Sequence, residues 1–292
     1  MESWIRERSS WIQRREGTTS LLTLMRPPIN ALDRMALNEL AEAVEKIEAD
    51  RETRVLVITS GVERIFCSGG DMNFWRQVRD GKEVSRVGRE AFARIERLSK
   101  PTIAAINGHV VGDGLNLALA CDLRIASEAA TIRLPEVAYG FIPGWGLIHR
   151  LVASVGRVNA YELLLTGRKV EATRAKMIGL VNEVVSPGQL MNEVLGRAQK
   201  MAAFSPAALR AVKCALLGGN EKACFEAVWG HADWREGIDA LLAKMKPEFR
   251  ADERRGEGCD FARCAQKYRP SAGGRSSLLR RFLARTSSFE DV

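Results

Sequence analysis

Residues 100–120 read KPTIAAINGHVVGDGLNLALA, and this stretch decides the fold. Its apolar run at 102–106 follows a Lys-Pro stop and predicts a strand that is buried on both faces. Residues 107–114 are rich in glycine, and the apolar residues that follow them, up to 120, predict a helix. A buried strand joined to a helix through a glycine loop is the unit from which α/β proteins with parallel strands are built.

The same alternation of strand and helix extends toward the N-terminus. Residues 20–24 and the β-branched run 55–58 predict two further strands. Apolar residues that recur every three or four positions predict one helix over 33–50, with Asp33 as its N-cap, and another over 84–98. The sequence therefore predicts an α/β architecture with parallel strands.

From Gly146 onward the sequence predicts mostly helices. A strand-like run at 180–185 interrupts them. Ser205-Pro206 predicts a helix start, because serine caps a helix and proline is tolerated in its first turn. A long helix over 221–245 is expected to close the folded part.

Composition limits the classes of protein to be considered. A chain of 292 residues with 46% apolar content can bury a large core, as one domain or as one domain with a helical extension, and this excludes disorder throughout. The net charge of +8 suits a phosphate-rich small molecule, a nucleic acid or an anionic membrane surface, and composition does not choose among them. Residues 251–292 are rich in Arg, Gly and Ser, which favours a flexible basic tail over a specific binding arm.

Cysteine usage and the N-terminus favour a cytoplasmic protein. The six cysteines contain no CxxC pair and are expected to be reduced. Residues 1–16 lack the apolar run of a signal peptide. No stretch approaches the roughly 20 apolar residues of a membrane span.

The glycine loop at 112–114 stands where a dinucleotide-binding fingerprint would stand, between a strand and a helix. Leu117 replaces the third glycine of that fingerprint, and Asp113 would place a carboxylate against the pyrophosphate, so a nucleotide site is not expected. Free N–H groups at the start of a helix suit a developing oxyanion instead.

A second glycine loop, from Ser68 to Asp71, also follows a buried strand. A parallel sheet can bring its N–H groups beside those of the first loop. Two such donors aimed at one oxygen form an oxyanion hole, and each contributes about 3–4 kcal/mol to the transition state. Taken alone, each loop is more often a tight turn.

Glu136 is a candidate proton-transfer group. It follows Leu134-Pro135 and precedes an apolar stretch that ends at Trp145. Such surroundings would raise its pKa and suit proton transfer near neutral pH, whereas a surface glutamate beside a loop is the open alternative. No metal site is expected, because three widely spaced histidines match no metal or nucleophile motif: His109, His149 and His231.

Motifs in a fixed order between residues 14 and 249 resemble the crotonase superfamily of enoyl-CoA hydratases and isomerases. The resemblance implies a core of repeated ββα turns wound into a superhelix, with the CoA-thioester site, over residues 1–192. It also implies a helical region at 193–250 that packs in homotrimers or dimers of trimers. The motifs lie at 26–32, 66–72, 100–114, 135–144, 150–151, 165–167 and 179–185.

On the matching positions of this sequence, the resemblance implies that Gly70 and Asp113 donate their backbone N–H groups to the thioester oxygen and that Glu136 is the catalytic acid/base. For such a hole to work, the carboxylate of Asp113 must point away from the developing negative charge. Asn116 stands at the position of the other hydratase glutamate and is expected to orient water or substrate. Substrate contacts are expected from Cys67, Ser68, Gly69, Asp71, Met72, Gly112, Gly114, Phe141, Pro143, Gly144 and Trp145, with Trp75 as a further candidate that core packing would equally explain.

Asn116 decides which activity the resemblance favours. An amide cannot accept a proton, so enoyl-CoA isomerisation by Glu136 alone is preferred, and enoyl-CoA hydration is the alternative. An acyl-CoA decarboxylase or hydrolase comes next. Another class is a non-catalytic CoA- or RNA-binding protein, but no RNA motif is present and nucleic acid is not expected as a partner. Coenzyme A is part of the acyl-CoA substrate, and no separate cofactor is expected.

Overall fold

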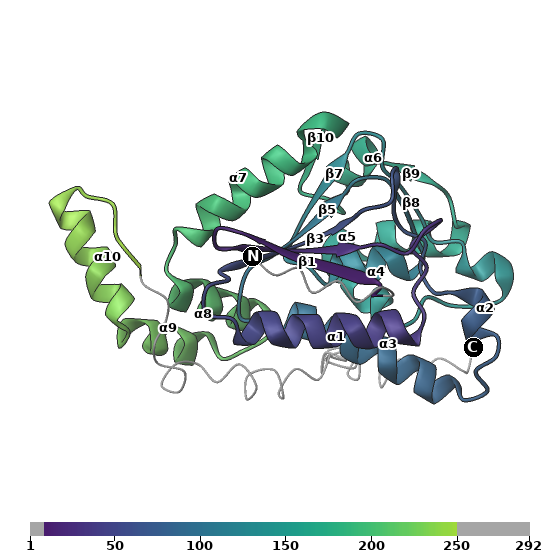
Figure 1. Ribbon diagram of the computed structural model, residues 1–292, viewed down its shortest axis with the longest axis horizontal. Helices are drawn as coiled ribbons and strands as arrows, with labels where there is room; N and C mark the ends of the chain where they lie inside the picture. Colours follow the sequence, from purple (N-terminus) through teal and green to yellow (C-terminus); the bar gives the residue numbers. More distant parts are fainter. Residues whose placement is uncertain (1–8, 250–292) are drawn as a thin grey trace, which may run out of the picture.

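The computed structural model describes residues 9–249, in which ten strands form two sheets (Figure 1). The six-stranded sheet has the order β1-β2-β3-β5-β7-β10, and only its β1–β2 pair is antiparallel. Its strands are β1 (Trp11–Glu16), β2 (Thr19–Leu24), β3 (Val55–Ser60), β5 (Thr102–Ile106), β7 (Leu123–Ser127) and β10 (Glu183–Val185). The four-stranded sheet consists of β4 (Ile65–Cys67), β6 (His109–Val111), β8 (Thr131–Arg133) and β9 (Val170–Glu171).

Ten α-helices and two short 3₁₀ helices connect and cover these strands within the described residues. The first half contains α1 (Arg34–Ala49), α2 (Met72–Trp75), α3 (Gly81–Glu96), α4 (Asp113–Leu119) and the 3₁₀ helix η1 (Glu136–Tyr139). The second half contains α5 (Leu147–Thr166), α6 (Ala172–Met177), η2 (Pro187–Gln189), α7 (Leu190–Ala202), α8 (Pro206–Leu216), α9 (Glu221–Trp229) and α10 (Ala232–Ala243).

Three successive ββα units build the core. In the units β3-β4-α3, β5-β6-α4 and β7-β8-α5, the first strand joins the large sheet and the second joins the small sheet. The parallel register places Leu56 opposite Thr102 and Ile103 opposite Leu123. This repetition confirms the predicted α/β fold of ββα turns.

Alternate residues of the large sheet face two separate apolar layers. Leu56 and Ile58 pack into the core that includes α1 and α3, whereas Val55 and Val57 pack against α7 (Figure 1). Because both faces are covered, the central strands contain continuous apolar runs rather than an alternation of apolar and polar residues.

Local signals set the predicted helix ends. Asp33 accepts a hydrogen bond from the amide of Ala36 at 2.8 Å, and α1 ends before Asp50, as predicted. Ser205 accepts one from the amide of Ala208 at 3.0 Å at the start of α8. Both contacts satisfy an amide that the first turn of a helix leaves without an intrahelical acceptor.

Several elements differ from the prediction. The helix expected over 221–245 is wrong, because the chain breaks after Gly230 and His231 caps a new helix by accepting a hydrogen bond from the amide of Asp233 at 3.1 Å. The strand expected over 180–185 is shorter, since only 183–185 pair with β7. Strand β1 was not predicted, and it pairs with β2 across a turn at Gly17.

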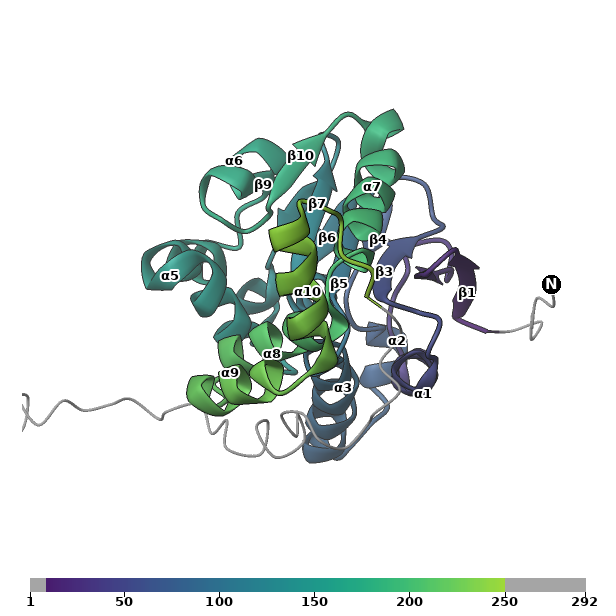
Figure 2. The ribbon, with the colours of Figure 1, turned by 90° about the vertical axis from the view of Figure 1, so that its left-hand side faces the viewer.

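The C-terminal helices α8, α9 and α10 lie together at one end of the molecule (Figures 1 and 2). The expected boundary at residue 192 falls within α7, which packs on the large sheet. The predicted tail at 251–292 lies outside the described residues. In the part of the chain that the structure describes, no helix is both long enough and apolar enough to cross a membrane.

Candidate active site

The loop after β4 pairs with the chain at Leu32 and directs the N–H of Gly70 away from it. The N–H of Leu32 donates to the carbonyl of Gly69 at 2.8 Å, and the N–H of Asp71 donates to the carbonyl of Leu32 at 2.9 Å. In such a parallel bridge the residue between the two bonded groups directs its own N–H to the opposite side. Asp71 then caps α2 by accepting from the amide of Asn73 at 2.9 Å.

The start of α4 packs against this loop at a distance that only glycines permit. A Cβ atom on Gly69 would lie 2.8 Å from the carbonyl oxygen of Val111 and 3.1 Å from the amide nitrogen of Asp113. A Cβ atom on Gly114 would lie 2.2 Å from the carbonyl oxygen of Cys67. The amide of Asp113 belongs to the first turn of α4, whose N–H groups have no intrahelical acceptor. The geometry therefore brings the two predicted amide donors into neighbouring loops.

The Glu136 carboxyl group faces the turn that precedes α4. A Cβ atom on Gly112 would lie 2.6 Å from Oε1 of Glu136. Among the described residues, nothing makes a hydrogen bond to the buried Oε2. Burial raises the pKa of Glu136, as the apolar neighbours in its sequence predict.

The Asp113 carboxyl group is buried and close enough to Glu136 to be affected by its negative charge. Its Oδ1 atom is buried and has no hydrogen-bond partner in the range 9–249. Burial, and then the negative charge of Glu136, raise the pKa of Asp113 to about 7, while the amide of Gly144 and the side chain of Asn116 oppose this rise. The site consequently contains two neighbouring carboxyl groups, of which the sequence indicated one.

Asn116 is fully buried and held by the protein at both ends of its amide. Its Oδ1 accepts from Nη1 of Arg150 at 3.0 Å, and its Nδ2 donates to the carbonyl of Gly144 at 3.4 Å. Arg150 in turn forms an ion pair with Glu96 at 2.7 Å. This network fixes the direction of the Asn116 amide and links α3, α4 and α5.

Arg150 and Glu96 were not singled out from the sequence as site residues. The resemblance to the crotonases used Arg150 only as part of a motif. The available signal is a charged side chain within an apolar helix, since such a group requires a partner when it is buried. The sequence cannot reveal that this partner comes from α3, 54 residues earlier in the chain.

The predicted aromatic residues occupy different positions. Trp75 lies directly beside Gly70, where an added Cβ atom would meet its ring at 3.0 Å, and its Nε1 donates to the carbonyl of Leu32. Trp145 is buried behind Trp75, with ring centroids 5.7 Å apart, and its Nε1 donates to the carbonyl of Val84. Phe141 is half exposed. Trp75 thus packs against the loop that carries Gly70.

The Cys67 thiol is a packed core group. It donates to the carbonyl of Asn30 at 3.2 Å, and burial raises its pKa to about 12. A thiol with such a pKa stays protonated at neutral pH and is a poor nucleophile.

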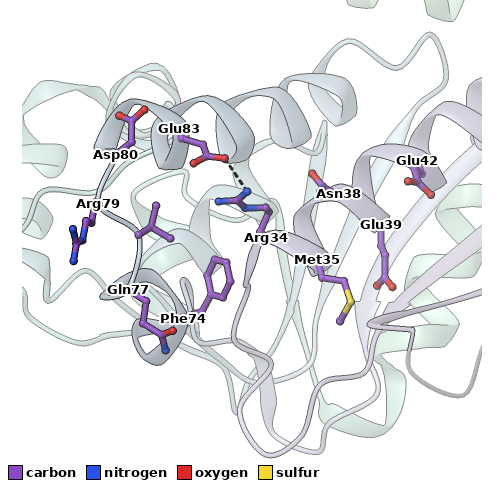
Figure 3. A pocket seen from close by; sticks show the side chains of 11 residues that line it. Arg34, Met35, Asn38, Glu39, Glu42, Phe74, Gln77, Arg79, Asp80 and Glu83 are labelled. Atoms are coloured by element: carbon purple, nitrogen blue, oxygen red, sulfur yellow. Dashed lines mark ion pairs between the residues drawn. The ribbon is translucent and has the colours of Figure 1, made fainter.

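An open groove is lined by residues of α1 and of the segment from α2 to the start of α3 (Figure 3). It has a volume of about 960 Å³ and separates α1 from the segment that contains α2 and the start of α3. Arg34 crosses it to pair with Glu83 at 2.8 Å. None of the predicted site residues lines this groove, whose walls are Arg34, Met35, Asn38, Glu39, Glu42, Phe74, Gln77, Val78, Arg79, Asp80 and Glu83. Within residues 9–249, no group of three or more His, Cys, Asp or Glu side chains is placed to hold a metal ion.

Comparisons with known proteins support one family. The family model for enoyl-CoA hydratase/isomerase matches residues 14–252. The chain is 37% identical over 248 residues to a probable enoyl-CoA hydratase of Rhizobium meliloti, a match that covers 80% of this chain and 95% of that protein. It is 33% identical over 255 residues to the short-chain-enoyl-CoA hydratase of Clostridium acetobutylicum, with 83% and 98% covered.

A solved structure gives the same result. The crystal structure of an enoyl-CoA hydratase from Bacillus anthracis superposes with a TM-score of 0.79 at 32% identity, over 84% of this chain and all of that chain. The repeated ββα units agree with this structural match. The chain therefore belongs to the enoyl-CoA hydratase/isomerase family, within the crotonase superfamily.

Proposed function

We propose that the protein adds water to the double bond of a 2-enoyl-CoA thioester. The observation that carries this proposal is the meeting of three groups: the Gly69-Gly70 loop, the amide of Asp113 and the carboxyl group of Glu136. In this proposal the amides of Gly70 and Asp113 donate to the thioester oxygen. Glu136 is the acid/base group, and coenzyme A is the non-reacting part of the substrate.

The chemistry follows from where negative charge develops. When the oxygen of water bonds to C3 of the enoyl group, the electrons of the double bond move toward the thioester oxygen and form an enolate. Two fixed N–H donors stabilise this oxyanion more than they stabilise the neutral carbonyl, so they accelerate the reaction. A carboxyl group with a raised pKa can exchange a proton with water or carbon near neutral pH.

Hydration is placed ahead of isomerisation for two reasons. Relatives that match over most of their length are named hydratases, among them the 2,3-dehydroadipyl-CoA hydratase of Escherichia coli at 36% identity. The site also holds a carboxyl group besides Glu136, although position 116 has none. Isomerisation remains the second candidate because Asn116 cannot act as a base, which leaves Glu136 to move a proton between two carbons of a 3-enoyl-CoA.

Parallel assays with 2-enoyl-CoA and 3-enoyl-CoA substrates test the proposal. We expect conversion of the 2-enoyl thioester to the 3-hydroxyacyl thioester and loss of this activity in Glu136→Gln, with CoA binding retained. A protein that shifts the double bond of the 3-enoyl substrate without adding water to the 2-enoyl substrate would instead be an isomerase. A near-normal rate in Glu136→Gln would refute the role of Glu136 in either reaction.

A further inference from the structure

Trp145 adopts a backbone conformation that tryptophan rarely takes. Its φ angle of 55° lies in the left-handed region, which a residue with a Cβ atom enters only at an energetic cost. Such a conformation persists only where the surrounding structure holds the residue in place. The packing of the Trp145 side chain must therefore compensate for the cost of its backbone.

The indole of Trp145 fills a notch in α3. A Cβ atom added to Gly88 would lie 2.1 Å from the Trp145 ring, so the ring fits against α3 because this position is a glycine. The Nε1 atom of Trp145 donates to the carbonyl oxygen of Val84 at 2.8 Å, and its ring packs against Phe92 with centroids 5.7 Å apart. The side chain is 4% exposed and is thus fixed against α3.

Trp75 connects Trp145 to the predicted oxyanion donor Gly70. The ring of Trp75 would meet a Cβ atom on Gly70 at 3.0 Å, and its centroid lies 5.7 Å from that of Trp145 in an edge-to-face contact. The Nε1 atom of Trp75 donates to the carbonyl oxygen of Leu32 at 2.8 Å, which holds the ring in place. Trp75, Trp145 and Phe92 therefore form one continuous set of packed rings beside Gly70, which we call the aromatic wall.

The backbone around Trp145 is bonded to the segment that carries the other predicted donor. The carbonyl oxygen of Trp145 accepts a hydrogen bond from Nη1 of Arg150 at 3.1 Å, and that of Gly144 accepts one from Nδ2 of Asn116 at 3.4 Å. Asn116 belongs to α4, the helix that begins at Asp113. Trp145 is therefore attached to both donor segments, and its indole occupies the space between them and α3.

We propose that the aromatic wall limits the acyl chain of the substrate to a few carbons, with Trp145 as the residue that sets this limit. This inference rests on the proposed function and deepens it by naming the substrate class, the short-chain 2-enoyl-CoA thioesters. A thioester whose oxygen is held by the amides of Gly70 and Asp113 places its acyl carbons against the residues that adjoin these donors. A longer chain that continued toward α3 would have to displace the buried indole. The packing lost around a buried indole exceeds the gain from burying a few methylene groups.

Hydration of 2-butenoyl-CoA and 2-decenoyl-CoA measures the chain-length preference. We expect the kcat/KM of the wild type to be at least about tenfold lower for the ten-carbon substrate. Trp145→Gly removes the indole and suits the left-handed backbone, and it should raise the ratio of the ten-carbon to the four-carbon kcat/KM by about 10–100-fold. The milder change Trp145→Leu should shift this ratio in the same direction.

Trp11→Leu is the matched control. Trp11 is 6% exposed, and its Nε1 atom also donates to a backbone carbonyl oxygen at 2.8 Å, that of Ala36 in α1. The substitution removes the same kind of buried ring from a different part of the core, so it should leave the ratio within about threefold of wild type. An equal shift in Trp11→Leu and Trp145→Leu would show that loosened packing in general changes the ratio, and the inference would be overturned.

Binding of butyryl-CoA and decanoyl-CoA, measured by calorimetry, separates this inference from the proposed function, because these saturated thioesters have no double bond to hydrate. If the protein hydrates neither enoyl substrate but Trp145→Gly still binds decanoyl-CoA more tightly relative to butyryl-CoA than wild type does, the hydratase proposal fails and the inference stands. A wild type that hydrates the ten-carbon substrate as efficiently as the four-carbon one overturns the inference, whether or not the Trp145 variants fold. A ratio that both Trp145 variants leave within about threefold of wild type also overturns it.

Discussion

The Asp113→Asn substitution should change how the free energy of unfolding depends on pH. Burial and the charge of Glu136 raise the pKa of Asp113 from 3.8 to about 7 in the folded state. Between these values the folded state binds more protons than the unfolded state, so the stability that this group contributes is fully present at low pH and decreases as pH rises toward 7. Each pKa unit corresponds to about 1.4 kcal/mol. The whole shift is therefore worth about 4 kcal/mol, of which about 3 kcal/mol falls between pH 5 and pH 8.

Urea unfolding of wild type and Asp113→Asn at several pH values, at one protein concentration, measures this difference. Comparing the two proteins at each pH cancels the titration of all other groups that do not contact Asp113. We expect the variant to gain about 3 kcal/mol on wild type between pH 5 and pH 8, with no further gain at higher pH. A difference that stays constant over this range would show that Asp113 has an ordinary pKa and would refute the effect of its burial near Glu136.

Three further outcomes follow from the structure. Arg150→Met removes the partner of Glu96 and the donor to Asn116, so it should lower the free energy of unfolding by about 1–3 kcal/mol in urea and also lower kcat. Gly114→Ala would place a Cβ atom 2.2 Å from the carbonyl oxygen of Cys67 and should lower the free energy of unfolding by about 1–3 kcal/mol. Gly196→Ala in α7, where a Cβ atom meets no atom within 4 Å, should not destabilise the protein, and equal effects of the two substitutions would contradict the close approach of the loops. The expected homotrimer or dimer of trimers predicts a mass about three or six times 32.3 kDa by light scattering, and Trp229→Glu on the exposed face of α9 should reduce this mass; a monomeric mass for wild type would disprove the expected assembly.

The buried strands and capped helices could be predicted because their signals are local. The run 102–106 coincides with β5, and Asp33 and Ser205 cap the helices that they were expected to cap. The short strands β4, β6 and β8 were not predicted, because three residues carry too little periodicity to identify a strand. The break at Gly230 was also missed, since a single glycine within an apolar periodic stretch is tolerated in many helices.

The candidate site was predictable as far as backbone and motif determine it. The neighbouring positions of the Gly69-Gly70 loop, the Asp113 amide and Glu136 follow from glycine loops at the ends of adjacent parallel strands. The direction of the Asp113 carboxyl group could not be predicted, because it depends on the Asn116 amide and on the loop at Gly144, which approach from other elements. Sequence reasoning therefore indicated the neighbouring glycine loops and Glu136, but not the position of the Asp113 carboxyl group.

The same proton on Asp113 links the stability and the activity of this protein. Ionisation of Asp113 adds a negative charge near Glu136, which costs folding free energy, and it would also repel the enolate that the proposed reaction forms. The free energy of unfolding therefore declines as the pH rises toward about 7, and above that pH the ionised carboxyl group also opposes the enolate. If Asp113 acts only through its backbone amide, its ionised side chain hinders the reaction above pH 7. The rate of Asp113→Asn should then match or exceed that of wild type. If the Asp113 side chain instead takes part in the reaction, Asp113→Asn should be slower than wild type. The rates of the two proteins at pH 8 therefore separate a carboxyl group that takes part in catalysis from one that hinders it.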